Sequence, residues 1–208
     1  MTLNYSQDRS SMRLFASLSL LLVVLTSGIP IAAAQNKKAE NVTAVLLGGP
    51  DVGRRAPDFS LPWANKDGIG PIEAPYQLAS DRGKTVVVAF YPRDFTNGCT
   101  AEMRTFAQQY DSLFGPDVVL VGISADSIET HQRFASSLKL PFRLLSDPDQ
   151  RVSKQYASKD KGGYNRRTVY VIGPDGRVKF RNMSFNALDP NDYAELRQAI
   201  RAPGGGEG

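Results

Sequence analysis

Cysteine, histidine and tryptophan each occur only once in this sequence of 208 residues. The single cysteine, Cys99, excludes an intramolecular disulfide, a CxxC redox motif and a structural zinc site built from cysteines of this chain. A Gly-rich phosphate-binding loop and an HExxH motif are also missing. We therefore expect neither a metal nor a cofactor, and the role of a lone thiol has to be explained.

An excess of charge of one sign is missing as well. The sequence has 25 Lys and Arg residues and 21 Asp and Glu residues, which gives a net charge of +4, and the basic residues are not clustered in one stretch. Nucleic acid as a partner is therefore poorly supported. With 41% hydrophobic and 22% charged residues, the composition is that of a globular protein and excludes collagen-like, coiled-coil and wholly disordered chains.

The one long apolar run lies near the N-terminus, at residues 14–34. It follows Arg9 and Arg13, its densest part is too short to span a bilayer, and it closes on three alanines ending at Ala34. This layout predicts a signal peptide over residues 1–34, cleaved after Ala34, and an extracytoplasmic protein, either periplasmic or secreted. Met12 is an alternative start, and a membrane anchor that stays uncleaved is the alternative fate of the segment.

The rest of the chain divides into one domain with two short flanks. Residues 35–51 have few periodic apolar positions, and residues 202–208 read APGGGEG, so we expect a flexible N-terminal segment and a flexible tail. Between them lies the predicted domain, residues 52–201.

Alternating apolar runs and amphipathic segments within this domain predict an α/β fold. The runs at residues 85–91, 118–123 and 168–172 are β-branched or aromatic and predict three buried central strands. The Pro174-Asp175-Gly176 turn then predicts a hairpin to a strand over residues 177–183, which makes one edge antiparallel.

Helical spacing of apolar residues predicts the helices between these strands. Residues 100–114 and 127–138 are amphipathic, with Ser127 as a candidate N-cap, residues 192–200 form a closing helix after Pro190, and residues 149–157 form a weaker one. This order resembles a thioredoxin-like fold, a central mixed β-sheet flanked by helices.

Cys99 lies directly after a buried strand and at the start of an amphipathic helix. A thiolate at that position faces unpaired backbone N–H groups and the positive end of the helix dipole, which stabilise it. Gly98 permits close approach of the backbone, Thr96 offers a hydroxyl, and Pro92 stiffens the exit from the strand. The alternative is a buried small apolar residue, the commoner fate of a free cysteine.

The pattern Pro92-x-x-x-Thr96-x-x-Cys99 resembles the peroxidatic motif of peroxiredoxins of the AhpC/TSA superfamily, and FYPRDFTNGCT is similar to the bacterioferritin-comigratory, PrxQ-like branch. Residues 53–61 and 121–126 are similar to other family segments, and residues 140–149 to a characteristic loop. The resemblance implies a thioredoxin-like fold and a thiol-dependent peroxidase that reduces hydrogen peroxide and organic hydroperoxides.

Carried over to this sequence, the motif implies roles for four residues. Cys99 would attack the peroxide, Thr96 and an arginine would position it and stabilise the thiolate, and Pro92 would shield the sulfur from water. Counting back from the 174–176 turn places the arginine at Arg167, with Arg166 as second choice.

Two further residues bear on this resemblance. Glu102 matches a glutamate that orients the arginine in many members, and it is equally a plain acidic residue of the first helical turn. The resolving cysteine of the branch often lies five residues after the first, where this chain has Arg104. We therefore expect a one-cysteine mechanism that uses an external thiol or a thioredoxin-like reductant.

Several alternatives stay open at this stage. Relatives of this type are monomers or homodimers, and we expect one of the two here. A non-catalytic thioredoxin-fold binding or chaperone module is the rival function if Cys99 is buried and inert. His131, with no cluster of acidic residues or cysteines near it in the sequence, is interpreted as a surface or half-buried structural residue. Residues 159–167 are interpreted as a solvated loop, and Trp63 as a packing residue.

Overall fold

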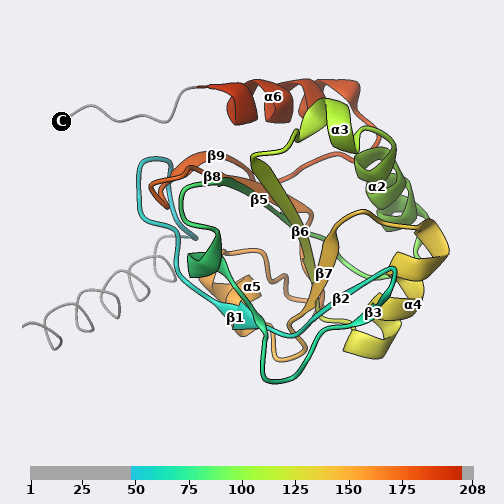
Figure 1. The fold of residues 1–208 in the computed structure, drawn as a ribbon. Helices are drawn as coiled ribbons and strands as arrows, with labels where there is room; N and C mark the ends of the chain where they lie inside the picture. The colour runs from blue at the N-terminus through green and yellow to red at the C-terminus, as the bar shows by residue number, and fades with distance from the viewer. Residues whose placement is uncertain (1–47, 203–208) are drawn as a thin grey trace, which may run out of the picture.

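The computed structural model describes residues 48–202, which form a mixed seven-stranded sheet covered on both faces (Figure 1). The strand order is β3-β2-β7-β6-β5-β8-β9. The strands are β2 (Trp63–Asn65), β3 (Gly68–Ile69), β5 (Thr85–Phe90), β6 (Val118–Ser124), β7 (Arg143–Ser146), β8 (Thr168–Ile172) and β9 (Val178–Asn182). A separate two-stranded sheet pairs β1 (Ser60–Leu61) with β4 (Tyr76–Gln77). The α/β thioredoxin-like fold expected from the sequence is confirmed.

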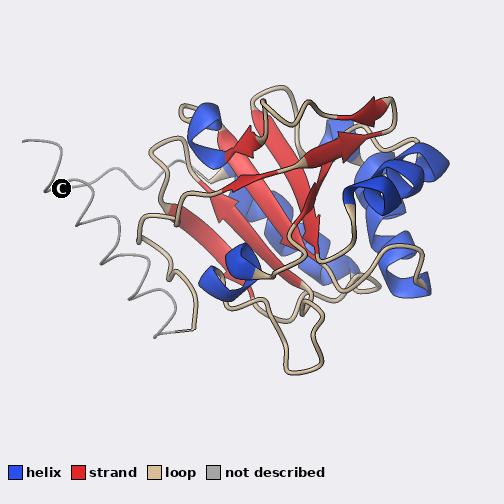
Figure 2. Ribbon diagram, turned by 90° about the horizontal axis from the view of Figure 1, so that it is seen from below, coloured by secondary structure: helices blue, strands red, loops and turns tan. Residues whose placement is uncertain are grey.

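The two faces of the large sheet carry two apolar clusters, because successive side chains of a strand point to opposite faces. Val87 and Ala89 of β5 pack in one cluster with residues of α2 (Asn97–Gln108), α3 (Tyr110–Leu113), α4 (Ile128–Leu138) and α6 (Pro190–Arg201). Val86 and Val88 pack on the other face against β1, β4, the short 3₁₀ helix η1 (Leu78–Asp81) and the region of α5 (Arg151–Gln155). Figure 2 shows this second face, with the strands crossing behind the shorter elements.

The directions of three central strands bring distant parts of the chain together. β5 runs parallel to β6, and it runs antiparallel to β8, with Phe90 opposite Thr168. The end of β5 and the beginning of β8 therefore meet at the same edge of the sheet. The segment after β5 contains Cys99, and the residue before β8 is Arg167.

The three predicted central strands and the hairpin from β8 to β9 are confirmed, and Ser127 caps α4 by accepting a hydrogen bond from the Thr130 N–H at 3.3 Å. The segment expected as a characteristic loop differs, since its residues 143–146 form β7, a parallel neighbour of β6 with Leu144 and Leu145 fully buried. Four residues were too few for periodicity to separate a strand from a loop.

Helix boundaries also differ from the prediction. The predicted helix 100–114 begins earlier, at Asn97, and breaks at Gln109 into α2 and α3. The closing helix begins at Pro190 because Asp189 caps it, accepting a hydrogen bond from the Asn191 N–H at 2.9 Å. The weak helix shrinks to Arg151–Gln155.

The predicted signal peptide over residues 1–34, and most of both predicted flexible segments, lie outside the described residues. Of residues 48–51, Gly49 and Pro50 are buried, and Arg181 forms an ion pair of 2.5 Å with Asp51. The folded part of the chain thus begins before residue 52. No helix between residues 48 and 202 has the length and apolarity needed to cross a membrane.

Candidate active site

Cys99 is the third residue of α2 and lies within the apolar cluster beneath the helices. The helix begins at Asn97 because Thr96 keeps an extended backbone while its carbonyl accepts the first helical hydrogen bond, from the Thr100 N–H at 2.8 Å. The sulfur therefore lies in the first turn of the helix, where backbone N–H groups have no helical partner. The residue is only 1% exposed.

Arg167, the residue before β8, reaches this sulfur from the neighbouring strand. Its Nη2 donates to Cys99 Sγ at 3.6 Å, across 68 residues of sequence, and its side chain is 18% exposed. A Cβ at Gly98 would lie 3.2 Å from the same Nη2, so a glycine at this position leaves room for the guanidinium. Arg166 points elsewhere and donates to the Ala157 carbonyl.

The loop that carries Arg167 is solvated only in part. Residues 161–164 are exposed, as expected for a solvated loop, whereas Asn165 is buried and its Nδ2 donates to the Ile123 carbonyl at 3.2 Å. The N–H of Phe185 donates to the Arg167 carbonyl at 3.0 Å. The backbone at Arg167 is thus anchored by the side chain of Asn165 before it and by the hydrogen bond to its own carbonyl.

Glu102 lies one turn beyond Cys99 and is fully buried. Its Oε2 accepts a hydrogen bond from Arg167 Nη1, whereas its Oε1 receives none within the described residues. Burial raises the pKa of Glu102 to about 7, against the lowering effect of Arg167. Burial alone lowers the pKa of Arg167, but Glu102 and then Cys99 raise it above its usual value. Of the two interpretations of Glu102, this contact supports the arginine-orienting one.

Thr96 and Pro92 lie in the segment that leads into the helix. Thr96 occupies the N-cap position but its side chain does not cap the helix; its hydroxyl donates to the Arg93 carbonyl at 3.0 Å and stays exposed. Its lone pairs remain able to accept a hydrogen bond from a peroxide. Pro92 is half-buried between β5 and the helix.

The same segment belongs to a second polar cluster, which sequence reasoning missed. His131 is fully buried, so its interpretation as a surface or half-buried residue is wrong. Its Nδ1 lies 2.8 Å from Asp94 Oδ2, and Tyr91 donates to Asp94 Oδ1 at 2.7 Å. One signal could have found it: His131 lies in the apolar stripe of its helix, with Phe134 and Leu138.

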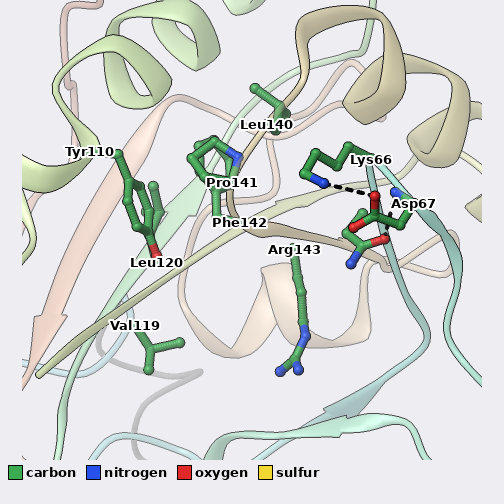
Figure 3. A pocket seen from close by; sticks show the side chains of 10 residues that line it. Lys66, Asp67, Tyr110, Val119, Leu120, Leu140, Pro141, Phe142 and Arg143 are labelled. Carbon is green, nitrogen blue, oxygen red and sulfur yellow. Dashed lines mark hydrogen bonds and ion pairs between the residues drawn. The ribbon is translucent and has the colours of Figure 1, made fainter. Parts of the chain in front are cut away.

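None of these groups lines a separate cavity of about 250 Å³, whose lining includes Tyr110, Phe142 and Arg143 (Figure 3). Its lining also includes Val119, near the start of β6, whereas Cys99 follows the end of the parallel strand β5. Arg143, which lines this cavity, places its guanidinium carbon 4.6 Å from the centre of the half-buried Trp63 ring. Within residues 48–202, no group of three or more His, Cys, Asp or Glu side chains could hold a metal ion.

Comparison with known proteins finds relatives for the part of the chain that contains Cys99, Glu102 and Arg167. Residues 52–181 match the AhpC/TSA family. A putative peroxiredoxin bcp of Coxiella burnetii is 37% identical over 135 residues, which cover 62% of this chain and 85% of the relative. Peroxiredoxin Q, chloroplastic, of Sedum lineare is 39% identical over 129 residues, which cover 61% of this chain and 66% of the relative.

Solved structures agree in fold. The crystal structure of peroxidoxin BcpB from Mycobacterium tuberculosis superimposes with a TM-score of 0.62 at 26% identity, covering 73% of this chain and 97% of the other. None of these comparisons favours a non-catalytic binding or chaperone module, and a merely structural cysteine has no need of a guanidinium beside it. The chain belongs to the AhpC/TSA family and is a peroxiredoxin of the Bcp and PrxQ type, a thiol-dependent peroxidase.

Proposed function

We propose that Cys99 is the peroxidatic residue and that Arg167, oriented by Glu102, stabilises its thiolate and the transition state. The observation that carries the proposal is the contact of Arg167 Nη2 with Cys99 Sγ, combined with the Arg167 Nη1 contact to Glu102. A buried acid fixes one edge of the guanidinium, so the other edge stays aimed at the sulfur.

In the first step the Cys99 thiolate attacks one oxygen of the peroxide. A sulfur–oxygen bond forms, the oxygen–oxygen bond breaks, and the departing oxygen leaves as water or an alcohol after taking up one proton. The sulfur is oxidised to a sulfenic acid and the peroxide is reduced. Negative charge grows on the departing oxygen, so the fixed guanidinium of Arg167 lowers the barrier there. The Thr96 hydroxyl accepts a hydrogen bond from the peroxide, and Pro92 limits the access of water.

In the second step an external thiol regenerates the enzyme. Because the chain has no second cysteine, the sulfenic acid condenses with a thiol of the reductant, releasing water and forming a mixed disulfide. A second thiol of the reductant then releases Cys99 and leaves the reductant oxidised. The reductant is a small thiol or a thioredoxin-like protein.

The proposed location is extracytoplasmic. Support comes from the basic residues, apolar run and alanine cluster of residues 1–34. Fractionation of cells that express the full chain tests it: N-terminal sequencing of the extracytoplasmic form is expected to begin at Gln35. A protein of full mass in the membrane fraction would favour the uncleaved anchor instead.

The catalytic proposal is tested by adding one equivalent of hydrogen peroxide to the protein, trapping sulfenic acid with a dimedone-type reagent and quantifying labelled Cys99 by mass spectrometry. We expect rapid labelling in the wild type and none at residue 99 in Cys99→Ser. Arg167→Ala is expected to slow labelling about 10²- to 10³-fold, the usual cost of losing a group that stabilises developing charge.

Arg166→Ala is the matched control, since it removes the same side chain from the neighbouring residue without touching the sulfur. It is expected to react within about twofold of the wild type, as substitutions away from the reacting atoms usually do. Equal slowing in both variants, or wild-type labelling no faster than that of a free thiol, would contradict the proposal.

A further inference from the structure

The segment between β5 and α2, residues 91–96, is tied to the neighbouring β6 and α4 by its backbone and by its side chains. The Asp94 N–H donates to Asp126 Oδ2 at 2.9 Å, and the Ser124 hydroxyl donates to the same oxygen at 2.7 Å. The ring of Phe95 packs on Phe134 of α4, with centroids 4.9 Å apart. Phe95 has a φ of 59°, a strained value for an aromatic residue, so tertiary contacts must hold this turn.

The strongest of these ties is the buried pair of Asp94 and His131, whose side chains have no exposed surface. His131 Nε2 lies 3.1 Å from the Leu145 carbonyl, which can only accept, so this nitrogen carries a hydrogen. His131 Nδ1 faces Asp94 Oδ2 at 2.8 Å. The Tyr91 hydroxyl lies 3.3 Å from the same nitrogen, so the buried imidazole joins the segment after β5 to the Leu145 carbonyl of β7.

The position of this pair relates it to the reaction. Asp94 lies two residues before Thr96 and five before Cys99, in the segment that must stay in place for the first turn of α2 to form. In this conformation Cys99 is 1% exposed, which suits a small peroxide but leaves no surface for the thiol of a protein. A protein thiol therefore needs the segment or the first turn of α2 to move before it can reach the sulfur.

We propose that Asp94 and His131 are positioning residues that hold residues 91–96 against α4, and so set the balance between the closed form that reacts with peroxide and the open form that reacts with bulky thiols. This inference rests on the proposed role of Cys99. Neither side chain contacts the sulfur in the structure; they act through the backbone that leads to Thr96 and α2.

Opposite effects on two rates follow from this arrangement. Loosening the segment displaces Thr96 and the first turn of α2, which slows attack on peroxide because the reacting groups are no longer aligned. The same loosening exposes Cys99 for longer, which speeds its reaction with a large reagent. Loss of global stability alone does not slow one reaction and speed the other in the folded protein.

The experiment measures both rates on the full chain in His131→Leu and Asp94→Asn. One rate is the peroxide-dependent oxidation of Cys99, followed by dimedone-type trapping. The other is alkylation of reduced Cys99 by a bulky uncharged maleimide. We expect oxidation to fall about tenfold and alkylation to rise about tenfold, with the milder effect in Asp94→Asn, which keeps the shape of the side chain.

Val86→Ala is the matched control, because Val86 is buried on the opposite face of the sheet. Its melting temperature is expected to fall, while the ratio of the two rates stays that of the wild type. Asp126→Ala is a second route to the same result, since half-buried Asp126 holds the Asp94 N–H. If His131→Leu does not fold, Asp94→Asn and Asp126→Ala decide the question.

The inference is overturned if these variants shift the ratio of the two rates no more than Val86→Ala does. Failure of the proposed function looks different: wild-type Cys99 would then react with peroxide no faster than a free thiol. In that case the alkylation rates still report whether Asp94 and His131 hold the segment closed.

Discussion

Two buried polar clusters involve the segment that leads into α2 and the helix itself, and they differ in how completely their atoms are paired. The cluster of Cys99, Glu102 and Arg167 is incomplete: Arg167 is partly exposed and Glu102 Oε1 accepts no hydrogen bond from the described residues. In the cluster of Tyr91, Asp94 and His131, both carboxylate oxygens and both ring nitrogens have partners.

The difference separates a cluster that can bind and react with a substrate from one that can only stabilise the fold. An unpaired buried oxygen and a guanidinium open to solvent leave capacity for a substrate and for a proton. A fully paired cluster gains nothing from a ligand and loses heavily when one member is removed, because the remaining groups stay buried without partners. Removing one member from each cluster should therefore have unequal effects on stability.

The largest expected effect is on the paired cluster. Asp94→Ala is expected to lower the free energy of unfolding by about 3–5 kcal/mol, the usual cost of breaking a buried pair. Arg167→Ala at pH 6 is expected to cost less than about 1 kcal/mol, because the pKa of Glu102 is about 7 and the buried carboxyl left behind is neutral at that pH. Urea unfolding at pH 6 gives both values. Equal losses in the two variants would remove the contrast between the clusters.

A smaller effect concerns the pH dependence of stability. The pKa of Glu102 rises from 4.5 to about 7 on folding, so between these values the native state binds more protons than the unfolded chain. The contribution of Glu102 is therefore fully present below pH 4.5 and is lost as the pH rises through about 7. We expect the unfolding free energy of the wild type to fall across this window by roughly 1–3 kcal/mol relative to Glu102→Gln.

Parallel curves for the wild type and Glu102→Gln between pH 4.5 and 8 would show that Glu102 stays ionised in the native protein. The substitution keeps an oxygen able to accept from Arg167, so the comparison isolates the charge. The same pair of proteins tests the reaction, since the orienting contact survives in Glu102→Gln and peroxide-dependent labelling of Cys99 is expected to persist.

The smallest expected effect lies at the beginning of α4, the helix that carries His131. Ser127→Ala removes the oxygen that accepts from the Thr130 N–H and is expected to lower the unfolding free energy by about 1 kcal/mol. Ser137→Ala makes the same change on an exposed face of that helix, where the hydroxyl only bonds back to the Phe134 carbonyl, and is expected to be neutral. A chemical denaturation series resolves the two, and an equal loss in both would argue against the cap.

Features that show a pattern among neighbouring residues could be predicted from the sequence, and features that depend on distant contacts could not. The strands at residues 85–90 and 168–172, and the helix capped by Ser127, follow from patterns within a dozen residues. The four-residue strand β7 did not, because it depends on pairing with β6 and β2. The start of α2 at Asn97 did not either, because its first three residues add no apolar periodicity that would mark a helix. The motif around Cys99 identified the reactive thiol at the start of a helix, but it could not show which side chains surround it.

The sequence by itself determined the three central strands, the hairpin that follows them and the helices between them, and it placed a lone thiol, with no partner cysteine in this chain, at the start of a helix. Only the tertiary structure decided that Arg167 and not Arg166 meets Cys99, that Glu102 is buried against that arginine, and that His131 is paired with Asp94. The reason is that local periodicity reports which face of an element is buried. The antiparallel pairing of β5 with β8 and the packing of α4 on the sheet decide which side chains meet there.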